Sequence, residues 1–436
     1  MSSSGVKIHW ESPQLGKRAP QAVSVTPSLP LASPIPHGRR GAEHILAATC
    51  FYDWRCGPDG PPAREYAPPL RRRRAMKLLL VFSTPSGGME TLNRIRSRAL
   101  AASGVDCHVL YTNEGSGLQN APGATVLVYR ETADILELIR REGYDMIVVC
   151  SHVVLLEQIR LSGYAGRLVF EVQGLGTPQQ AEEFLRDYGS VLRFCADGLL
   201  YPVTGHLQAM FGGAYPELPQ FCFDDPLDTD SFGYSRFPVV PYPILGWIGR
   251  IEPNKNWREL ASIAEALVPA FPQLALWMFE DASLYDPAER QSFEQWRRIS
   301  PVAGRLTLRS NVPHSQMADY LSLIGDSGGL LVSCSIREGF GYAVAEALLC
   351  RCPVLATDSG GVTRFISPGQ TGELYPLGDI GAAAAGAYRL MQDVAYRESI
   401  RVQGERHIRE RFSAAAYVAH FHAMLQAMQA VQPKRP

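Results

Sequence analysis

From residue 76 onward, short apolar segments alternate with longer amphipathic ones, and no other feature of the chain limits its fold as strongly. Residues 77–83 (KLLLVFS) and 145–151 (DMIVVCS) are almost continuously apolar, which is typical of strands buried on both faces of a parallel sheet. Residues 89–103 and 133–143 instead carry apolar side chains at helical spacing. The alternation predicts an α/β fold built from doubly wound parallel sheets.

A second series of the same kind begins after the proline-rich stretch 237–243 (FPVVPYP). It comprises predicted strands at 244–250, 274–280, 328–335 and 353–359, and predicted helices at 257–271, 317–324 and 342–350. A chain of 436 residues exceeds one ordinary domain. We therefore expect two Rossmann-like domains, residues 76–240 and 241–412, facing each other across a central cleft, with a long amphipathic helix within 413–436.

Residues 1–75 differ from the rest of the chain. They are rich in proline, serine and arginine and show no sustained periodicity, so little apolar surface is available to offset the entropy cost of ordering. We expect a disordered or loosely attached extension, or, alternatively, a misassigned upstream reading with the true start at Met76. The segment 71–82 imitates a signal peptide, but its apolar part is too short and no cleavage site follows.

Composition argues against several classes of function. The formal net charge is −1, which gives no electrostatic case for nucleic acid as a partner. No apolar run reaches the roughly 18 residues of a membrane-spanning helix, so we expect at most peripheral contact with a membrane. The 9 cysteines contain no C-x-x-C spacing, which favours reduced thiols in a cytoplasmic protein.

Two glutamates, Glu338 and Glu346, flank a Gly-Phe-Gly sequence within residues 335–348 (SIREGFGYAVAEAL). Retaining glycosidases hold two carboxylates about 5 Å apart, whereas eight helical residues span about 12 Å. We therefore expect separate contacts with one extended ligand rather than an acid–base pair. The plain structural alternative is that Glu338 caps a helix and Glu346 is a solvated helix residue.

The residues between the two glutamates indicate the kind of ligand. Gly339 and Gly341 allow a ligand to approach the backbone closely. A helix that starts near Tyr342 would offer free N–H groups and a positive dipole end to an anion. Carboxylates on either side can accept hydrogen bonds from sugar hydroxyls, as acidic residues of Rossmann-type sites do from ribose. The pattern predicts a ligand that carries a nucleotide.

Several segments together resemble glycosyltransferase family 4, a group of retaining enzymes with the GT-B fold. They follow the family's order along the chain: 226–232 (PLDTDSF), 245–257 (LGWIGRIEPNKNW), 333–348 with its E-x7-E pattern, 353–362 (PVLATDSGGV) with 371–379 (TGELYPLGD), and 412–425 (FSAAAYVAHFHAML). The resemblance covers roughly residues 76–430. It implies that the C-terminal domain binds a nucleotide-sugar donor, and that the last helix crosses back to the N-terminal domain on the acceptor side.

The resemblance also implies roles for the residues of the E-x7-E segment. Glu338 would contact hydroxyls of the donor sugar, and Glu346 would hold the ribose of the nucleotide. The backbone of Gly339, Phe340 and Gly341 would lie beside the donor.

Two cations complete the implied donor site. Arg250 and Lys255 would clamp the donor diphosphate, the arginine as a rigid fork of donors and the lysine as a point charge. Neutralising charge on the leaving nucleoside diphosphate lowers the barrier, so we assign Arg250 and Lys255 to catalysis, together with Glu338 as the contact with the donor sugar. Taken in isolation, the two cations would be ordinary surface residues.

In the N-terminal half, Gly87 and Gly88 occupy the first strand-to-helix turn, where open parallel sheets bind ligands. The resemblance implies a contact there with the donor phosphate or the acceptor. Many relatives have a histidine after the strand 167–173, where this chain has Gln173, which can bind a sugar hydroxyl but cannot carry a proton. His152 is the nearest alternative contact, although a lone histidine at a strand end usually serves structure.

Other positions depart from the family pattern. Arg351 and Glu280 stand where the family has glycine, as does Ala282, and Arg364 stands where it has glutamate. These departures motivate the alternative of a catalytically reduced homologue that binds nucleotide sugars or acts as a scaffold. A third interpretation is an epimerase or a phosphorylase of the same fold, but we find no clear motif for the lysine with which a glycogen-type phosphorylase would hold pyridoxal phosphate.

Two further signals receive structural interpretations. The D-x-D at residues 228–230 imitates a metal motif but lies in the domain-joining segment, and no cluster has metal-ligand spacing, so we expect no obligatory metal. Arg94, Arg96 and Arg98 are expected to form a solvated helix face.

The sequence thus predicts a cytoplasmic, retaining glycosyltransferase. Its substrate would be a UDP-, GDP- or ADP-sugar, and its acceptor a saccharide, a lipid or a small molecule. The common setting of such enzymes is the synthesis of cell-surface polysaccharide or glycolipid, at most at the inner face of the membrane.

Overall fold

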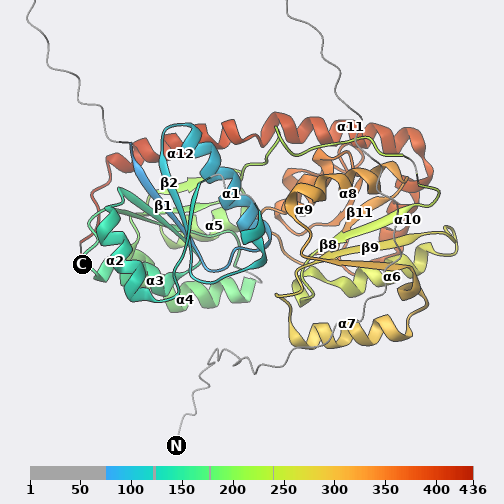
Figure 1. Cartoon of the computed structure of the whole chain (residues 1–436), viewed down its shortest axis with the longest axis horizontal. Helices are drawn as coiled ribbons and strands as arrows, with labels where there is room; N and C mark the ends of the chain where they lie inside the picture. The colour runs from blue at the N-terminus through green and yellow to red at the C-terminus, as the bar shows by residue number, and fades with distance from the viewer. Residues whose placement is uncertain (1–74, 121–123, 176–177, 239, 436) are drawn as a thin grey trace, which may run out of the picture. The chain divides into compact units, whose positions relative to one another are not determined.

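The computed structural model describes residues 75–120, 124–175, 178–238 and 240–435. The predicted extension, residues 1–75, lies outside the described residues except for Ala75. The described part contains two parallel sheets with flanking helices, which confirms the predicted α/β fold class (Figure 1). Within these ranges, no helix combines the length and the apolar character needed to cross a membrane.

The first sheet has seven parallel strands in the order β3-β2-β1-β4-β5-β6-β7. Its strands are β1 (Lys77–Phe82), β2 (Asp106–Tyr111), β3 (Thr125–Val128), β4 (Met146–Cys150), β5 (Arg167–Glu171), β6 (Gly198–Tyr201) and β7 (Gln220–Cys222). Its helices are α1 (Gly87–Ala102), α2 (Thr132–Glu142), α3 (Val153–Leu161), α4 (Pro178–Cys195) and α5 (Gly205–Ala214), with the short 3-10 helix η1 (Ser116–Gln119). The strand order reverses between β1 and β4, which makes their carboxyl ends a ligand-binding position.

The second sheet has six parallel strands in the order β10-β9-β8-β11-β12-β13, reversing between β8 and β11. Its strands are β8 (Ile244–Ile248), β9 (Ala275–Glu280), β10 (Leu306–Ser310), β11 (Leu330–Ser333), β12 (Val354–Thr357) and β13 (Glu373–Tyr375). Its helices are α6 (Trp257–Leu267), α7 (Pro287–Ile299), α8 (His314–Asp326), α9 (Tyr342–Leu349), α10 (Ile380–Gln392) and α11 (Val394–Arg411), with the 3-10 helices η2 (Pro253–Lys255), η3 (Pro301–Arg305) and η4 (Gly361–Arg364).

Burial explains the continuous apolar strands. In β1 the four central residues, 78–81, are fully buried, and all five residues of β4 are buried as well. A strand covered by helices on both faces has no solvent side, so polar residues do not alternate with apolar ones along it. The helix ends follow ordinary rules, as in α7, where Asp286 caps the first turn and Pro287 occupies the first helical position.

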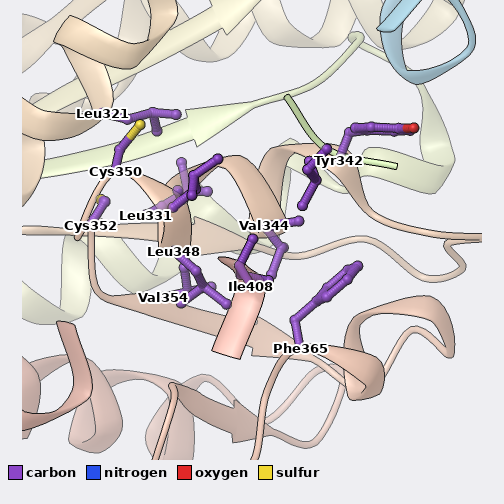
Figure 2. Packing of buried hydrophobic residues seen from close by; sticks show 14 of the residues in the cluster. Leu321, Leu331, Tyr342, Val344, Leu348, Cys350, Cys352, Val354, Phe365 and Ile408 are labelled. Atoms are coloured by element: carbon purple, nitrogen blue, oxygen red, sulfur yellow. The ribbon is translucent and has the colours of Figure 1, made fainter. Parts of the chain in front are cut away.

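Helix α9 is buried in the apolar core of the second half. Figure 2 shows Val344 and Leu348 of this helix among side chains from the neighbouring strands and from α11. The apolar residues between Glu338 and Glu346 therefore serve the core. Cys350 and Cys352 lie in the same cluster, and burial raises the pKa of the Cys352 thiol to about 12. The seven cysteines within the described ranges are free thiols.

The last helix, α12 (Ala414–Gln429), packs on the first sheet rather than the second. Its Tyr417 and Phe421 are buried in one cluster with Leu78 and Leu80 of β1. The helix also contacts α1 (Figure 1). The last helix therefore lies against the first sheet. The division of the domains at residues 240 and 412 stays a prediction.

The expected solvated arginine face on α1 is wrong for Arg96. Its side chain is 0% exposed, and its guanidinium forms a two-pronged ion pair with Glu171, at 2.6 and 2.8 Å. Arg94 is mostly buried and pairs with Glu90, whereas Arg98 is half-exposed and pairs with Asp228. Helical periodicity treats every arginine as polar surface and carries no information about a partner 75 residues away.

Candidate functional site

A cavity of about 680 Å³ lies between the carboxyl ends of the two sheets. Its walls come from the segments that follow β1 and β5 in the first half, and β8, β9, β10 and β11 in the second. Both sheets therefore contribute the loops that bind ligands in open α/β folds. The cavity is large enough for an extended ligand of nucleotide-sugar size.

Ten of the eleven predicted site residues line this cavity. They are Gly87, Gly88, Gln173, Arg250, Lys255, Glu338, Gly339, Phe340, Gly341 and Glu346. His152 is the eleventh, and it does not belong to the lining. Its Nδ1 accepts a hydrogen bond from the backbone N–H of Leu155 and caps α3, and burial lowers the pKa of its imidazole.

Glu338 and Lys255 form an ion pair at the edge of the cavity. Their side chains are 16% and 20% exposed, so solvent or a ligand reaches both. Asn254 fixes the geometry by exchanging two 3.0 Å hydrogen bonds with the backbone of Arg337. Arg250 is the more exposed cation and contacts Glu252 at 3.1 Å. A cation that is already held beside the cavity needs little rearrangement to meet an anionic ligand.

Glu346 lies on α9 and faces α8. Its Oε1 is 2.7 Å from Nε2 of His314, whose ring packs on Phe232 with 4.6 Å between ring centres. Glu346 is 8% exposed, so the alternative of a solvated helix position is wrong. Glu338 does not cap α9, because the helix starts after Gly341 without a side-chain cap. Each glutamate thus has its own partner, Lys255 for Glu338 and His314 for Glu346. Their separate contacts with one extended ligand stay a prediction.

The Gly-Phe-Gly turn requires its glycines. A Cβ on Gly339 would lie 1.5 Å from the carbonyl oxygen of Gln173, and Gly341 has a φ of +97°, which side chains rarely adopt. The ring of Phe340 is buried among Tyr342, Phe365 and other aromatic residues, so the ring itself serves the core. The turn brings the backbone of the second half directly against the first half.

The glycine turn at the start of α1 faces the same cavity. Gly87 has a φ of +59°, and a Cβ on Gly88 would lie 3.1 Å from the ring of Tyr342. Ser86, just before the helix, donates a hydrogen bond to Oδ2 of Asp281 at 2.6 Å, and Ser116 donates to the same oxygen at 2.6 Å. Because Gly87 and Gly88 carry no side chain, this turn leaves space between the two halves.

Asp281 is a cavity residue that the sequence did not suggest. It follows β9 directly, so its position at the carboxyl end of a parallel strand was the available signal. Burial pushes its pKa up, but hydrogen bonds from Ser116, Ser283 and Ser86 outweigh burial and hold the pKa below its ordinary value. His314, after β10, and Asp225 were missed in the same way.

The residues that depart from the family pattern form local contacts. Arg364 forms a two-pronged pair with Asp224 at 2.8 and 3.2 Å. Arg351 adopts a φ of 53°, the conformation that suits glycine, and pairs with Glu405 at 2.5 Å. Glu280 lines the cavity, pairs with Arg290 and accepts a hydrogen bond from Ser310 at 3.1 Å. The fourth departure, Ala282, donates its backbone N–H to Asn311.

The D-x-D segment takes part in ordinary contacts. Asp228 is buried, pairs with Arg98 and accepts a hydrogen bond from the backbone of Ser231 at 3.1 Å. Over the described ranges, no group of three or more histidine, cysteine, aspartate or glutamate side chains is arranged to hold a metal ion.

Comparison with known proteins gives a consistent result. Residues 238–407 match the family model described as "Glycosyl transferases group 1". A curated 2-deoxystreptamine N-acetyl-D-glucosaminyltransferase of Niallia circulans is 23% identical over 166 residues, which are 38% of this chain and 40% of that protein. The match thus spans less than half the length of this curated relative.

Two solved structures share the fold of nearly the whole described part. Sucrose-phosphate synthase from Thermosynechococcus elongatus superposes with a TM-score of 0.67 at 20% identity, covering 81% of this chain and 99% of that one. Anabaena HepE in complex with UDP-glucose superposes with a TM-score of 0.67 at 17% identity, covering 81% and 100%. At such identities the likeness establishes the GT-B arrangement of two parallel-sheet domains and nothing about substrate.

Proposed function

Because residues 238–407 belong to the group 1 glycosyl transferases and the chain has the GT-B fold, we propose that this protein is a retaining glycosyltransferase. It transfers a sugar from a nucleoside-diphosphate sugar to a hydroxyl group of an acceptor. The observation that carries the proposal is the convergence of Arg250, Lys255, Glu338 and Glu346 on one cavity between the two sheets.

Each of these side chains suits one part of such a donor. Arg250 and Lys255 are cations in the cavity that the N-terminus of α9 also lines, where a diphosphate would meet free N–H groups. Glu346 accepts hydrogen bonds from ribose hydroxyls, and Glu338 from hydroxyls of the transferred sugar. Lys255 has three N–H donors, so it can keep Glu338 and bind a phosphate oxygen together.

The reaction exchanges one bond for another at the anomeric carbon. The bond from this carbon to the phosphate oxygen breaks, and its electron pair leaves with the nucleoside diphosphate. The acceptor oxygen bonds to the same face of the carbon, and its proton passes to the departing phosphate. Arg250 and Lys255 neutralise the charge that develops on the leaving group, which lowers the barrier. No protein nucleophile is assigned.

The acceptor is a saccharide, lipid or small molecule, in cell-surface polysaccharide or glycolipid synthesis as the family resemblance implies. The first half of the molecule contributes the acceptor side of the cavity through the turn at Gly87 and Gly88 and through Gln173. The reaction takes place in the cytoplasm, at most at the inner face of the membrane, which agrees with the free cysteines. No metal is needed for the charge neutralisation that the two cations provide.

A catalytically reduced homologue is the second candidate, favoured by the departures at Gln173, Arg351 and Arg364. Arg364 and Arg351 have carboxylate partners outside the cavity lining, which gives both substitutions a structural reason. The enzyme is therefore the better-supported candidate. Detection of sugar transfer to any acceptor would distinguish the enzyme from the catalytically reduced homologue.

The proposal is tested with a panel of UDP-, GDP- and ADP-sugars. We expect one nucleotide class to raise the unfolding temperature and its sugar to be released or transferred with an added acceptor. Lys255→Ala and Glu338→Ala should weaken binding or turnover, whereas Arg140→Ala, a change on the exposed face of α2, serves as the matched control. Absence of binding by every member of the panel, or unaltered behaviour of both site variants, would refute the proposal.

A further inference from the structure

Gln173 lies where the two halves of the cavity meet. It follows β5 by two residues, and its backbone carbonyl is the atom that a side chain at position 339 would strike. The glutamine is therefore next to the Gly-Phe-Gly turn, beside which the transferred sugar would bind. Its side chain is partly exposed and belongs to the cavity lining.

Two carboxyl groups hold the amide nitrogen of this glutamine. Nε2 donates to Oε1 of Glu171 at 3.0 Å and to Oδ1 of Asp225 at 3.2 Å. An amide nitrogen has two N–H groups, and both are used. Among the described residues, no donor contacts the side-chain carbonyl oxygen, Oε1. The oxygen is thus the part of the amide that is left for a ligand.

The reverse orientation of the amide is unfavourable. Both carboxyl oxygens of Glu171 accept hydrogen bonds from Arg96, at 2.6 and 2.8 Å, and both side chains are almost fully buried. A flipped amide would place its carbonyl oxygen against a carboxyl oxygen that already serves as an acceptor. The buried ion pair therefore decides which end of Gln173 faces the cavity.

Asp225 is the second acceptor for the amide nitrogen of Gln173, and its carboxyl group differs from that of Glu171 in its environment. It is 4% exposed, and no described residue donates to or accepts from its Oδ2. Burial, followed by the charge of Glu171, raises the pKa of Asp225 to about 8. A neutral carboxylic acid still offers Oδ1 to the amide, and it adds no second negative charge beside Glu171.

The surroundings of Asp225 contain one full positive charge close by. The charged and titratable groups that face it are Arg96, Cys150, Glu171, Asp224, Tyr342 and Tyr417. Arg96 is committed to Glu171, and Asp224 is paired with Arg364. Arg96 is the one cation among these groups, and its charge lowers the pKa of Asp225 by less than burial and Glu171 raise it.

We infer that Glu171 and Asp225 hold Gln173 as a hydrogen-bond acceptor, so that its side-chain carbonyl accepts from a hydroxyl group of a sugar bound in the cavity. Glu171 and Asp225 are positioning residues, since they act through the amide. The inference rests on the proposed function, because it takes the ligand to be a sugar. It adds a selection rule: the sugar must present an O–H here, and a carboxylate or a fluorine at that position is rejected.

The test uses the full-length protein and the nucleotide that the panel identifies. Affinity is measured for the nucleoside diphosphate, for its sugar, and for sugars in which single hydroxyls are replaced by fluorine, which cannot donate. We expect one fluorinated position to bind about 3- to 10-fold more weakly to the wild type, the worth of one hydrogen bond. Gln173→Met should abolish this discrimination, and Gln173→Asn, with a shorter side chain, should do the same if the methionine variant folds poorly.

Two arms identify which sugar is bound. If the donor sugar meets Gln173, the gain in affinity of nucleotide sugar over nucleotide shrinks in Gln173→Met. If the acceptor sugar does, donor affinity is kept while the KM for the acceptor rises and kcat changes less. Both results support the inference, whereas a Gln173→Met protein with wild-type discrimination and wild-type KM overturns it. Binding of the nucleotide alone to the wild type is the control: it shows that a negative result overturns the role of Gln173 and not the proposed function.

Asp225→Asn supplies the pH readout. Above pH 8 the wild type gains a negative charge near an anionic donor, so its affinity for the nucleotide sugar should fall between pH 7 and pH 9. The asparagine variant keeps an acceptor oxygen but cannot ionise, so we expect a loss smaller than that of Gln173→Met and no such fall. An equal fall in both proteins contradicts the assigned role of Asp225.

Discussion

The two halves of the molecule bring charge to the cavity in different ways. In the second half, Lys255 with Glu338 and His314 with Glu346 are partly buried pairs at the cavity edge. In the first half, the ion pair of Arg96 and Glu171 is fully buried behind Gln173. The second half thus presents partly exposed charged pairs to a ligand, whereas in the first half a buried ion pair orients the neutral amide of Gln173.

This contrast separates stability from binding. A buried pair cannot lose one member without leaving an uncompensated charge in a dry environment. A pair at the edge of a cavity keeps access to water, so the loss of one member costs little stability and removes a ligand contact. Variants of the two regions should therefore fail in different assays.

The largest effect is expected from the buried pair of the first half. Arg96→Ala leaves Glu171 without its counter-charge and should lower the free energy of unfolding by about 3–5 kcal/mol. Urea denaturation measures this change. Arg98→Ala, on the same helix but 47% exposed, is the matched control and should cost less than about 1 kcal/mol. Equal losses in the two variants would remove the distinction between the halves.

The second effect concerns activity rather than stability. Glu338→Ala and Lys255→Ala should each lower kcat about 100-fold, because each removes a polar contact with the developing charge or the donor sugar. Their unfolding free energies should change by about 1 kcal/mol or less. Steady-state kinetics with the identified donor, next to urea denaturation, separates the two quantities. A stability loss as large as that of Arg96→Ala would contradict this assignment.

The third effect is the pH dependence of stability that Asp225 causes. Its pKa is raised from 3.8 to about 8 in the folded protein, so the native state binds the extra proton between these values. Stability contributed by this group is therefore full below pH 4 and is lost as pH rises through 8. The slope approaches about 1.4 kcal/mol per pH unit for one proton. Unfolding of the wild type and Asp225→Asn between pH 5 and pH 8 checks it, and parallel curves would contradict it.

The smallest effect belongs to Arg351, which has a positive φ. Arg351→Gly relieves a conformation that costs a side chain roughly 1 kcal/mol, but it also removes the pair with Glu405. We expect a net gain of about 0.5 kcal/mol in the free energy of unfolding. Arg351→Ala keeps the strain and loses the pair, so it should be less stable than the wild type. An alanine variant as stable as the glycine variant would show that backbone strain is unimportant there.

The sequence predicted much of this arrangement, and the reasons are local. Continuous apolar strands identified both sheets, and the E-x7-E segment located the residues around α9, because strand and turn signals lie within a few residues of each other. The segment 245–257 identified Arg250 and Lys255 in the same manner. These residues do line one cavity.

What the sequence could not supply are the pairings between distant segments. Arg96 finds Glu171 across 75 residues, and Asp281 accepts hydrogen bonds from Ser86 and Ser116, which precede it by 195 and 165. Neither composition nor periodicity contains information about contacts between residues so far apart in the sequence. The orientation of Gln173 depends on two of these distant partners, so it became visible only in three dimensions.

The central claim is that the cavity binds a nucleoside-diphosphate sugar through the charged residues of the second half. Calorimetric titration of the wild type and of Lys255→Ala with UDP-, GDP- and ADP-sugars tests it most directly. We predict saturable binding of one nucleotide class to the wild type and at least about tenfold weaker binding to the variant. Absence of binding to the wild type, or equal affinity of the two proteins, would contradict the account.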